Sequence, residues 1–322
     1  MLKRVLLFIM VLLGVTACKQ PQSEGLAHIR LPMGYIPDPQ YAPFYVAVEK
    51  GYFTEEGIEI EFDYSFETDG VALVGAEELQ FAVVSGEQVI LARAQGLPLV
   101  YVVEWFQRFP VAIVSKEGAG IRQPSDLLGR TVGLPGFFGA SYVGYSGLLF
   151  ASGLAPQDIN AVEIGFNQVE SLLTDQSEAV VGYANNEPVQ LANAGEAINV
   201  IYVADFIDMV ANGIITNEST IANDPELVQG FVRAFLRGLT DTLADSAGAY
   251  AISKNFVEGL DDSRLPVLEA SLPMWQADLL GATDADSWEQ TQDVLIKMDF
   301  LDAPVEDLLS AYTNEFVLEA QP

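Results

Sequence analysis

The segment that most constrains this chain lies near its start, GYIPDPQYAPFYVAVEKGYF at residues 34–53. An apolar run at 29–33 precedes it and predicts a β-strand. A turn rich in proline follows, and residues 41–50 predict a helix that Gly51 ends in the left-handed conformation. A strand, a rigid turn and a helix in this order indicate an α/β fold.

The same junction carries side chains that can hold a ligand. In an open α/β sheet, ligands bind beyond the carboxyl ends of the strands. The rings of Tyr35, Tyr41 and Phe44 and the carboxyl of Asp38 would lie there. We therefore expect these four residues in a binding site.

A second strand, turn and helix follow at residues 79–96. The apolar run at 79–84 predicts a buried strand, and Ser85 and Gln88 fit a capping box at the start of the next helix. Glu87 lies in the first turn of that helix. Ser85 and Glu87 are site candidates, and Trp105, which follows the next strand, is another.

A similar pattern recurs about a hundred residues later. The strand predicted at 179–183 leads to Asn185, Asn186 and Glu187, and Pro188 lies in the first turn of a helix. Chance recurrence of common strand–helix chemistry is one interpretation. The other is two lobes of similar architecture, each offering a strand-end turn to a shared cleft.

A glycine-rich loop at 134–140 lies between these two copies. It follows a strand predicted at 130–133 and leads into a helix that starts near Ser141. Backbone amides at such a helix start favour anions or carbonyl oxygens, but the loop lacks the spacing of a phosphate loop. Phe137 and Phe138 are either ligand contacts or core residues. The site candidates from this region are Gly136, Phe137, Phe138, Gly139, Ser141 and Tyr142.

The chain is long enough for two lobes, each with its own core. We expect it to cross between them near residues 110–116 and 212–216. Lobe I would then comprise 29–110 and 217–322, and lobe II 111–216. From Pro225 onward the pattern is helical.

The charge of the chain excludes some partners. It has 45 acidic against 15 basic residues and a formal net charge of -30. Such a surface repels phosphate backbones, so we expect no nucleic-acid partner, and self-repulsion favours a monomer.

The first residues predict export. Residues 1–17 have the positive start, apolar run and small-residue end of a signal peptide. Cys18, the only cysteine, follows directly, and the end of this segment resembles a bacterial lipoprotein signal. The resemblance implies a lipid on Cys18, a short tether at 18–28 and an extracytoplasmic protein held at the cell membrane.

The sequence lacks the usual parts of an enzyme. It has one histidine, His28, and no second cysteine, so Ser-His-Asp catalysis and thiolate or His-rich metal sites are hard to build. We expect no catalytic residue, no metal and no cofactor. The candidate rings, amides and carboxyls suit an uncharged or weakly charged flat aromatic solute better than an anion; an enzyme acting on a heterocycle is the alternative of another class.

Several motifs resemble one protein family. The segment at 34–53, with EGI at 56–58, QGLP at 95–98, DLLGRTVG at 126–133 and NEP at 186–188, is similar to the NMT1/THI5-like group of ABC-importer solute-binding proteins. The likeness extends over nearly the whole chain after the signal segment. It implies a two-lobed periplasmic-binding-protein fold, each lobe a mixed sheet flanked by helices, that delivers its solute to an ABC permease and its ATPase.

Members of this group bind thiamine-pyrimidine precursors, riboflavin or alkanesulfonates. The enzyme branch carries a cysteine-rich motif and an essential histidine, which this sequence lacks. In pyrimidine binders the loop corresponding to 135–141 cradles the ligand, and here it holds Phe137 and Phe138, which suits a larger flat ring system. The resemblance therefore implies riboflavin as cargo, with a thiamine pyrimidine as the alternative.

Overall fold

The structure is a computed structural model that describes residues 25–321. The predicted signal peptide at 1–17 and Cys18 lie outside the described residues. Across the described range, no helix combines the length and the apolar character needed to cross a bilayer.

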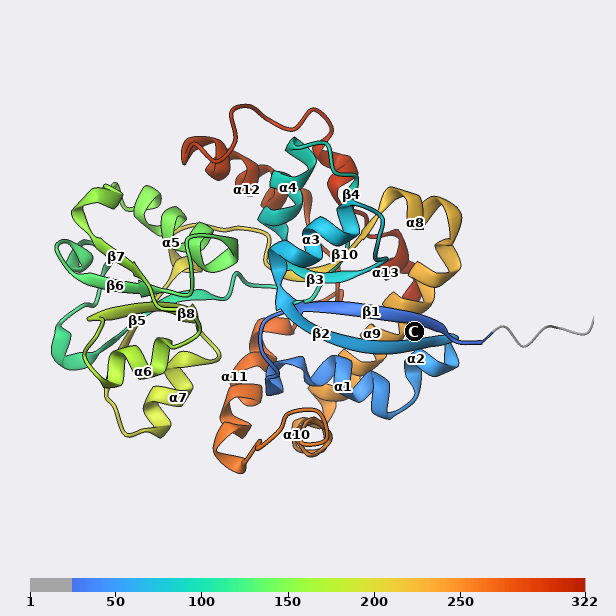
Figure 1. Cartoon of the computed structure of the whole chain (residues 1–322), viewed down its shortest axis with the longest axis horizontal. Helices are drawn as coiled ribbons and strands as arrows, with labels where there is room; N and C mark the ends of the chain where they lie inside the picture. Colours follow the sequence, from blue (N-terminus) through green and yellow to red (C-terminus); the bar gives the residue numbers. More distant parts are fainter. Residues whose placement is uncertain (1–24, 322) are drawn as a thin grey trace, which may run out of the picture.

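The described chain forms two lobes, shown at the right and left of Figure 1. In lobe I, β1 pairs in parallel with β2, and β10 lies antiparallel between β3 and β4. Because β1 also packs beside β3, the spatial order is β2-β1-β3-β10-β4. The strands of lobe I are β1 (Ala27–Gly34), β2 (Ile58–Phe66), β3 (Ala82–Ser85), β4 (Leu99–Glu104) and β10 (Asn212–Asn217).

Lobe II has one five-stranded sheet of order β7-β6-β8-β5-β9. Strand β6 is parallel to β7 and β8, whereas β5 is antiparallel to β8 and β9. The order matches lobe I, with an antiparallel strand between the third and fourth strands of each unit. These strands are β5 (Val111–Lys116), β6 (Thr131–Leu134), β7 (Asn160–Glu163), β8 (Ala179–Tyr183) and β9 (Ile198–Tyr202).

Helices flank both sheets, so the predicted fold of two α/β lobes is confirmed (Figure 1). Those of lobe II are α5 (Gly139–Ala151), α6 (Gln168–Leu173) and α7 (Glu187–Asn193). Those of lobe I are α1 (Ala42–Glu49), α2 (Tyr52–Glu55), α3 (Glu67–Gly75), α4 (Gly86–Ala94), α8 (Glu218–Asn223), α9 (Pro225–Ala244), α10 (Ser246–Ser253), α11 (Leu265–Trp275), α12 (Ala285–Lys297) and α13 (Glu315–Ala320).

Local chemistry explains the opening segment. The Asp38 carboxylate accepts a hydrogen bond from the backbone N–H of Gln40 at 3.0 Å, which starts a 3₁₀ turn that leads into α1. Gly51 has φ of 77°, a left-handed conformation that favours glycine, and it ends α1 as the sequence predicts. The strand, turn and helix of this segment therefore agree with the prediction.

The two crossings between the lobes differ from the prediction. The chain leaves β4 at Glu104 and enters β5 at Val111, and it leaves β9 at Tyr202 and enters β10 at Asn212. Residues 212–216, expected as a crossing, instead form a buried central strand of lobe I, because β10 pairs with both β3 and β4. Lobe II therefore ends before Asn212.

Candidate ligand-binding cleft

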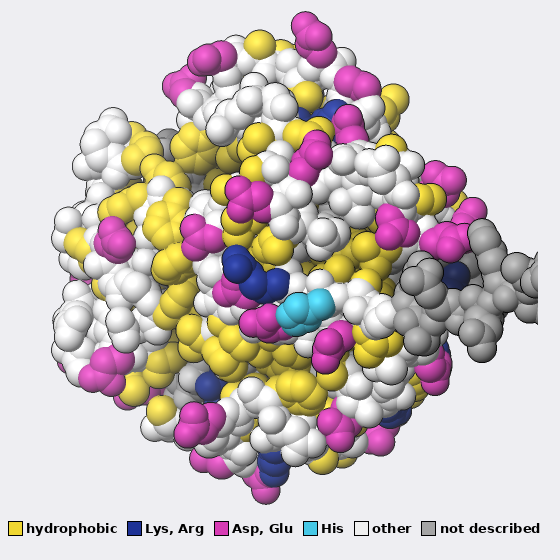
Figure 2. All heavy atoms as spheres, turned by 45° about the vertical axis from the view of Figure 1, so that its right-hand side comes forward, with side chains coloured by type: hydrophobic (Ala, Val, Ile, Leu, Met, Phe, Trp, Pro, Cys, Tyr) yellow, Lys and Arg dark blue, Asp and Glu magenta, His cyan; other side chains and the backbone are white. Residues whose placement is uncertain are grey.

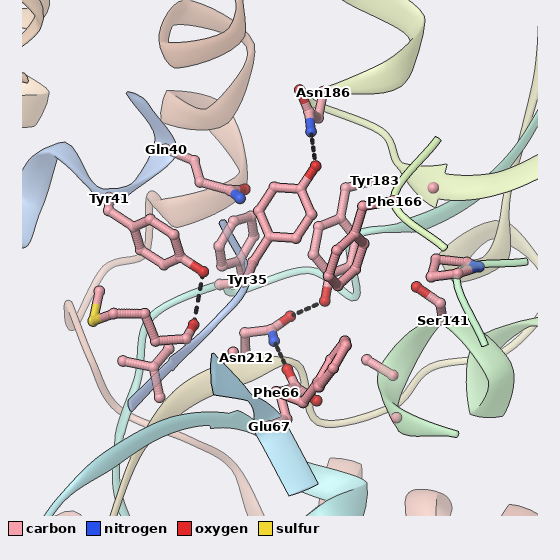
Figure 3. Close-up of a pocket in the computed structure, with 18 of the residues that line it drawn as sticks. Tyr35, Gln40, Tyr41, Phe66, Glu67, Ser141, Phe166, Tyr183, Asn186 and Asn212 are labelled. Atoms are coloured by element: carbon pink, nitrogen blue, oxygen red, sulfur yellow. Dashed lines mark hydrogen bonds between the residues drawn. The ribbon is translucent and has the colours of Figure 1, made fainter. Parts of the chain in front are cut away.

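The candidate site is a cleft between the lobes, at the strand ends of both sheets (Figure 3). The space between the lining atoms, counted with its open mouth, is about 800 Å³. Aromatic side chains of both lobes line this cleft, which we call the slot. Lobe I and the first crossing supply Met33, Gly34, Tyr35, Gln40, Tyr41, Phe66, Glu67, Val83, Trp105, Phe106 and Asn212, and lobe II supplies Pro135, Phe138, Gly139, Ala140, Ser141, Phe166, Gln168, Gly182, Tyr183, Asn186 and Glu187.

Aromatic rings from the two lobes meet across this slot. Tyr35 contacts Phe166 edge-to-face, with ring centroids 4.8 Å apart. Phe66 lies 5.6 Å from Phe166 and 5.5 Å from Phe138, again measured between centroids. Tyr35 and Phe66 belong to lobe I, and the other two rings belong to lobe II. The lobes are thus closed on one another through rings that can stack on a ligand.

The inner end of the slot is built from buried rings. Tyr41 lies 5.7 Å from Trp105, and its hydroxyl donates a 2.7 Å hydrogen bond to the Met33 carbonyl oxygen. Phe106 lies 6.4 Å from Tyr183. Tyr41, Trp105 and Phe106 are each less than 4% exposed, so this end of the slot is part of the protein core.

A carboxyl of lobe I lines the slot through Glu67, the first residue of α3. Its Oε1 accepts a 2.8 Å hydrogen bond from the Asn212 amide, whose Oδ1 lies 3.1 Å from the Tyr183 hydroxyl (Figure 3). Its Oε2 accepts from the Ser85 hydroxyl at 3.1 Å. Burial, and then the neighbouring Glu87, raise the pKa of Glu67 to about 8.

A carboxyl of lobe II lines the slot through Glu187, at the start of α7. Its Oε2 accepts a 2.7 Å hydrogen bond from the Tyr183 backbone N–H. A Cβ at Gly182 would lie 2.4 Å from the same oxygen, so glycine at this position leaves room for the Glu187 carboxyl. Burial raises the pKa of Glu187 to about 7.

Polar side chains also tie the lobes together beside the slot. Asn186 donates to the Tyr35 hydroxyl at 3.4 Å and accepts from Arg264 at 3.3 Å. Arg264 forms an ion pair with the buried Asp38. Burial raises the pKa of Asp38 to about 6 although Arg264 opposes the rise. These contacts join the opening turn of lobe I, the segment before α11 and the start of α7.

The charge of the slot favours neutral ligands. Among the described residues that line it are two carboxyls, Glu67 and Glu187, and no lysine, arginine or histidine. Arg264, which contacts the lining residue Asn186, is engaged by Asp38. An anionic ligand would find no partner charge in this lining, whereas N–H donors of a ligand would find amide and carboxyl oxygens.

The structure brings half of the sequence-predicted candidates to the slot. The candidates that line it are Tyr35, Tyr41, Trp105, Phe138, Gly139, Ser141, Asn186 and Glu187. The candidates outside the lining are Asp38, Phe44, Ser85, Glu87, Gly136, Phe137, Tyr142 and Asn185.

Several of the remaining candidates support the lining from behind. Asn185 is fully buried and donates to Gln40 Oε1 at 3.2 Å. Ser85 binds the lining carboxyl of Glu67 with the hydroxyl expected to cap α4, so the predicted capping box is wrong, since α4 has no side-chain cap. Glu87 is fully buried beneath it.

Other candidates face elsewhere. Phe44 packs in the core of lobe I, 4.5 Å from Phe235 between centroids. Phe137 is 46% exposed and contacts the edge of Tyr142, which itself lies 5.7 Å from Phe300. Gly136 packs against the Phe138 ring, because a Cβ at Gly136 would lie 2.5 Å from a carbon of that ring. The prediction that these residues line the site is therefore corrected: Phe44, Gly136, Phe137 and Tyr142 lie outside the lining.

The sequence analysis did not predict site residues in the turns after β2 and β7, which are equivalent strands of the two lobes. Phe66 ends β2 and Glu67 follows it, and Phe166 and Gln168 follow β7. The available signal was the similar turn that follows β3 and β8. The same comparison applied to the preceding strands, β2 and β7, would have indicated these residues.

The rest of the surface offers less chemistry. Figure 2 shows one face of the molecule, where acidic side chains are scattered among neutral ones and the single histidine lies at the surface. His28 lies 3.0 Å from Glu61, and both are more than half exposed. Over residues 25–321, no group of three or more His, Cys, Asp or Glu could hold a metal ion.

Comparison with known proteins identifies relatives along nearly the whole chain. The riboflavin-binding protein RibY of Chloroflexus aurantiacus is 41% identical, over 98% of each chain. A formylaminopyrimidine-binding protein of Halalkalibacterium halodurans is 25% identical, over 97% of this chain and 99% of its own.

Solved structures share the fold. The alkanesulfonate-binding protein SsuA of Xanthomonas axonopodis pv. citri, bound to MOPS, superposes with a TM-score of 0.71 at 14% identity, covering 90% of this chain and 99% of that one.

The family profile described as NMT1/THI5 like matches residues 38–249. With that match and a relative 41% identical along almost its full length, the chain belongs to the NMT1/THI5-like family.

Proposed function

We propose that this protein is the solute-binding component of an ABC importer and that its cargo is riboflavin. The observation that carries the proposal is the slot walled by aromatic rings of both lobes. Riboflavin has a flat three-ring system that fits between such walls, and one edge of it carries carbonyl and N–H groups. The amides and carboxyls at one side of the slot can read that edge.

The similarity to RibY of Chloroflexus aurantiacus supports the same cargo. The lining also favours the free vitamin over its phosphate ester, because Glu67 and Glu187 line the slot and the described lining offers no basic side chain to a phosphate. We expect riboflavin to bind and to leave unchanged, so that it is cargo and not a cofactor.

The proposal includes the cellular setting. The protein would be exported, carry lipid on Cys18, stay at the cell membrane as a monomer, and pass its cargo to a permease driven by an ATPase. The signal-like start of the chain supports export and anchoring. Metabolic labelling with palmitate, compared with Cys18→Ala, tests the anchor, and label that persists in Cys18→Ala would contradict it.

Titration tests the cargo. Protein lacking residues 1–18 should quench riboflavin fluorescence with a stoichiometry of one and rise in melting temperature with ligand concentration. The phosphate ester should bind more weakly. The same protein should fail to quench after substitution of Tyr35 and Phe166 by alanine, because both rings wall the slot.

A thiamine pyrimidine is the second candidate, favoured by the formylaminopyrimidine-binding relative. A hydroxymethylpyrimidine would be smaller than the slot and would leave part of its aromatic wall uncovered. If this compound raises the melting temperature and flavins do not, the pyrimidine is the cargo.

An enzyme acting on a heterocycle is the third candidate. Under that function, incubation would convert the ligand, and the loss of Glu187 or Glu67 would stop the conversion. Recovery of unmodified riboflavin in stoichiometric amount, measured by mass spectrometry, supports transport.

A further inference from the structure

A hydroxyl in lobe I lies between two carboxyls. The Ser85 Oγ is 3.1 Å from Glu67 Oε2 and also within hydrogen-bond distance of Glu87 Oε1. A hydroxyl has one hydrogen and can donate to one of these oxygens only. The other contact needs a proton on a carboxyl, so the array of Glu67, Ser85 and Glu87 is satisfied when it holds one carboxyl proton.

The surroundings of Glu87 favour the same protonation state. Its side chain is fully buried, and its Oε2 has no hydrogen-bond partner among the described residues. Gln88 donates to the other oxygen at 3.1 Å. A full negative charge at such a position would be poorly compensated. Burial therefore raises the pKa of Glu87.

Groups from every neighbouring element leave the array without a cation. Asn212 on β10 donates to Glu67, the charge of Glu87 on α4 acts on Glu67, and the charge of Glu67 acts on the hydroxyls of three tyrosines. These are Tyr41 before α1, Tyr101 on β4 and Tyr183 on β8. No lysine, arginine or histidine of the described chain is among these groups.

The array lies at the boundary between the lobes. Lobe II covers Glu67 through the first turn of α5: the Ala140 backbone N–H is close enough to lower the pKa of Glu67, and a Cβ at Gly139 would lie 3.7 Å from its Oε2. Next to it, Phe66 of lobe I contacts Phe138 of lobe II. Separation of the lobes removes this cover and exposes Glu67 to water.

We propose that closure of the lobes on the ligand binds one proton at the array of Glu67, Ser85 and Glu87, so that ligand capture is coupled to proton uptake. The inference rests on the proposed solute-binding function. It makes the proton a second ligand of the closed form, bound behind the polar side of the slot.

The sign of the coupling follows from burial. In the closed form the pKa of Glu67 is about 8, above the ordinary value of 4.5 that a water-exposed glutamate approaches. The proton then favours the closed form. Affinity is greatest below the ordinary value, falls as pH rises, by roughly tenfold per pH unit at most, and levels off above the closed-form value.

Isothermal titration of the full chain, purified in detergent, with riboflavin tests the coupling. At pH 7, in two buffers of different ionisation enthalpy, the binding heats should differ by the uptake of about half to one proton. Uptake below about a tenth of a proton overturns the inference. Absence of riboflavin binding at every pH contradicts the proposed function and this inference together, whereas binding without uptake overturns the inference alone.

Variants assign the proton to the array. Glu67→Gln should abolish the uptake and flatten the pH profile, whatever its absolute affinity, and Ser85→Ala should reduce the uptake. Glu104→Gln is the matched control, since Glu104 is a buried carboxyl of lobe I that accepts a hydrogen bond from the Ala211 backbone N–H and does not line the slot. Uptake that persists in both array variants, or disappears in the control, places the proton elsewhere and overturns the inference.

Discussion

The two lobes have sheets of the same strand order, yet they bring a carboxyl to the cleft by different routes. In lobe II, Glu187 follows the third strand, β8, and lines the slot. In lobe I the glutamate after the third strand, Glu87, is fully buried, and the carboxyl in the slot is Glu67, which follows the second strand, β2. A repeated motif therefore does not imply a repeated role.

The length of the turn explains the difference. Four positions separate Glu187 from the strand end at Tyr183, and the side chain folds back onto the Tyr183 backbone N–H. Glu87 comes two positions after Ser85, and between them Gly86 is so close to the second crossing that its Cβ would lie 2.2 Å from Val210. The short turn packed against the crossing directs Glu87 into lobe I.

The largest expected effect is a difference in unfolding free energy between variants of the two aromatic walls of the slot. Trp105, which belongs to the lobe I side, is buried against Tyr41 and Trp275. Trp105→Ala should lower the free energy of unfolding by about 3–5 kcal/mol, measured by urea denaturation, because it leaves a cavity. Phe138→Ala, on the lobe II wall and 43% exposed, should cost less than about 1 kcal/mol. Equal costs would show that both walls belong to the core.

The next effect concerns the residue that joins the lobes. Arg264→Ala leaves the buried carboxyl of Asp38 without its cation and removes the contact with Asn186 of lobe II. At pH 8 we expect a loss of about 2–4 kcal/mol in unfolding free energy and faster ligand release. The loss should shrink at pH 5, where Asp38 can take a proton.

The matched control for Arg264 is Lys254→Ala, which breaks a surface pair with Asp262 that lies within lobe I. It should cost less than about 0.5 kcal/mol and leave ligand release unchanged. Urea denaturation at both pH values and stopped-flow release of ligand measure the two effects. If both variants behave alike, Arg264 does not hold the lobes together.

A third effect tests how the lobes share the pH dependence of stability. Burial raises the pKa of Glu104 in lobe I to about 7. Stability from such a group is complete below its ordinary value of 4.5 and is lost as pH rises through the folded value. The unfolding free energy should therefore fall between pH 5 and 8, and Glu104→Gln should recover about 1–2 kcal/mol of that fall.

Glu187→Gln is the comparison in lobe II, since burial raises the pKa of Glu187 to about 7 as well. Urea denaturation at several pH values measures both variants. A stability that rises from pH 5 to 8 would contradict the sign of both shifts.

Much of the fold could be predicted from the sequence, since its signals are local. The opening segment, the helix after Pro225 and the strand at 179–183 all have patterns that tertiary packing did not override. The crossing at 212–216 was misplaced because its apolar residues belong to a central strand whose partners, β3 and β4, lie far away in sequence. Long-range pairing of this kind leaves no local mark.

The lining of the candidate cleft was predictable where a turn directly follows a recognised strand, as for Tyr35, Asn186 and Glu187. It was not predictable where burial decides the direction of a side chain. Phe44 and Phe137 both have the residue type of a ligand contact, and one lies in the core while the other lies on the surface. Only the packed structure distinguishes the two.

The smallest effect asks which of two adjacent rings on lobe II contacts the ligand. Phe138 lines the slot and lies 5.5 Å from Phe66 of lobe I, whereas Phe137 contacts Tyr142 outside the lining. Loss of one stacking ring is worth about 0.5–1.5 kcal/mol, so Phe138→Ala should weaken riboflavin binding by roughly two- to tenfold in a fluorescence titration. Phe137→Ala should bind as the unmodified protein does, because its ring covers no part of the slot. If Phe137→Ala weakened binding as much as Phe138→Ala, the loop before α5 would have to turn both rings toward the ligand. Lobe II would then form its wall of the slot by a rearrangement. Lobe I cannot rearrange in this way, because its rings Trp105 and Tyr41 are buried in the core.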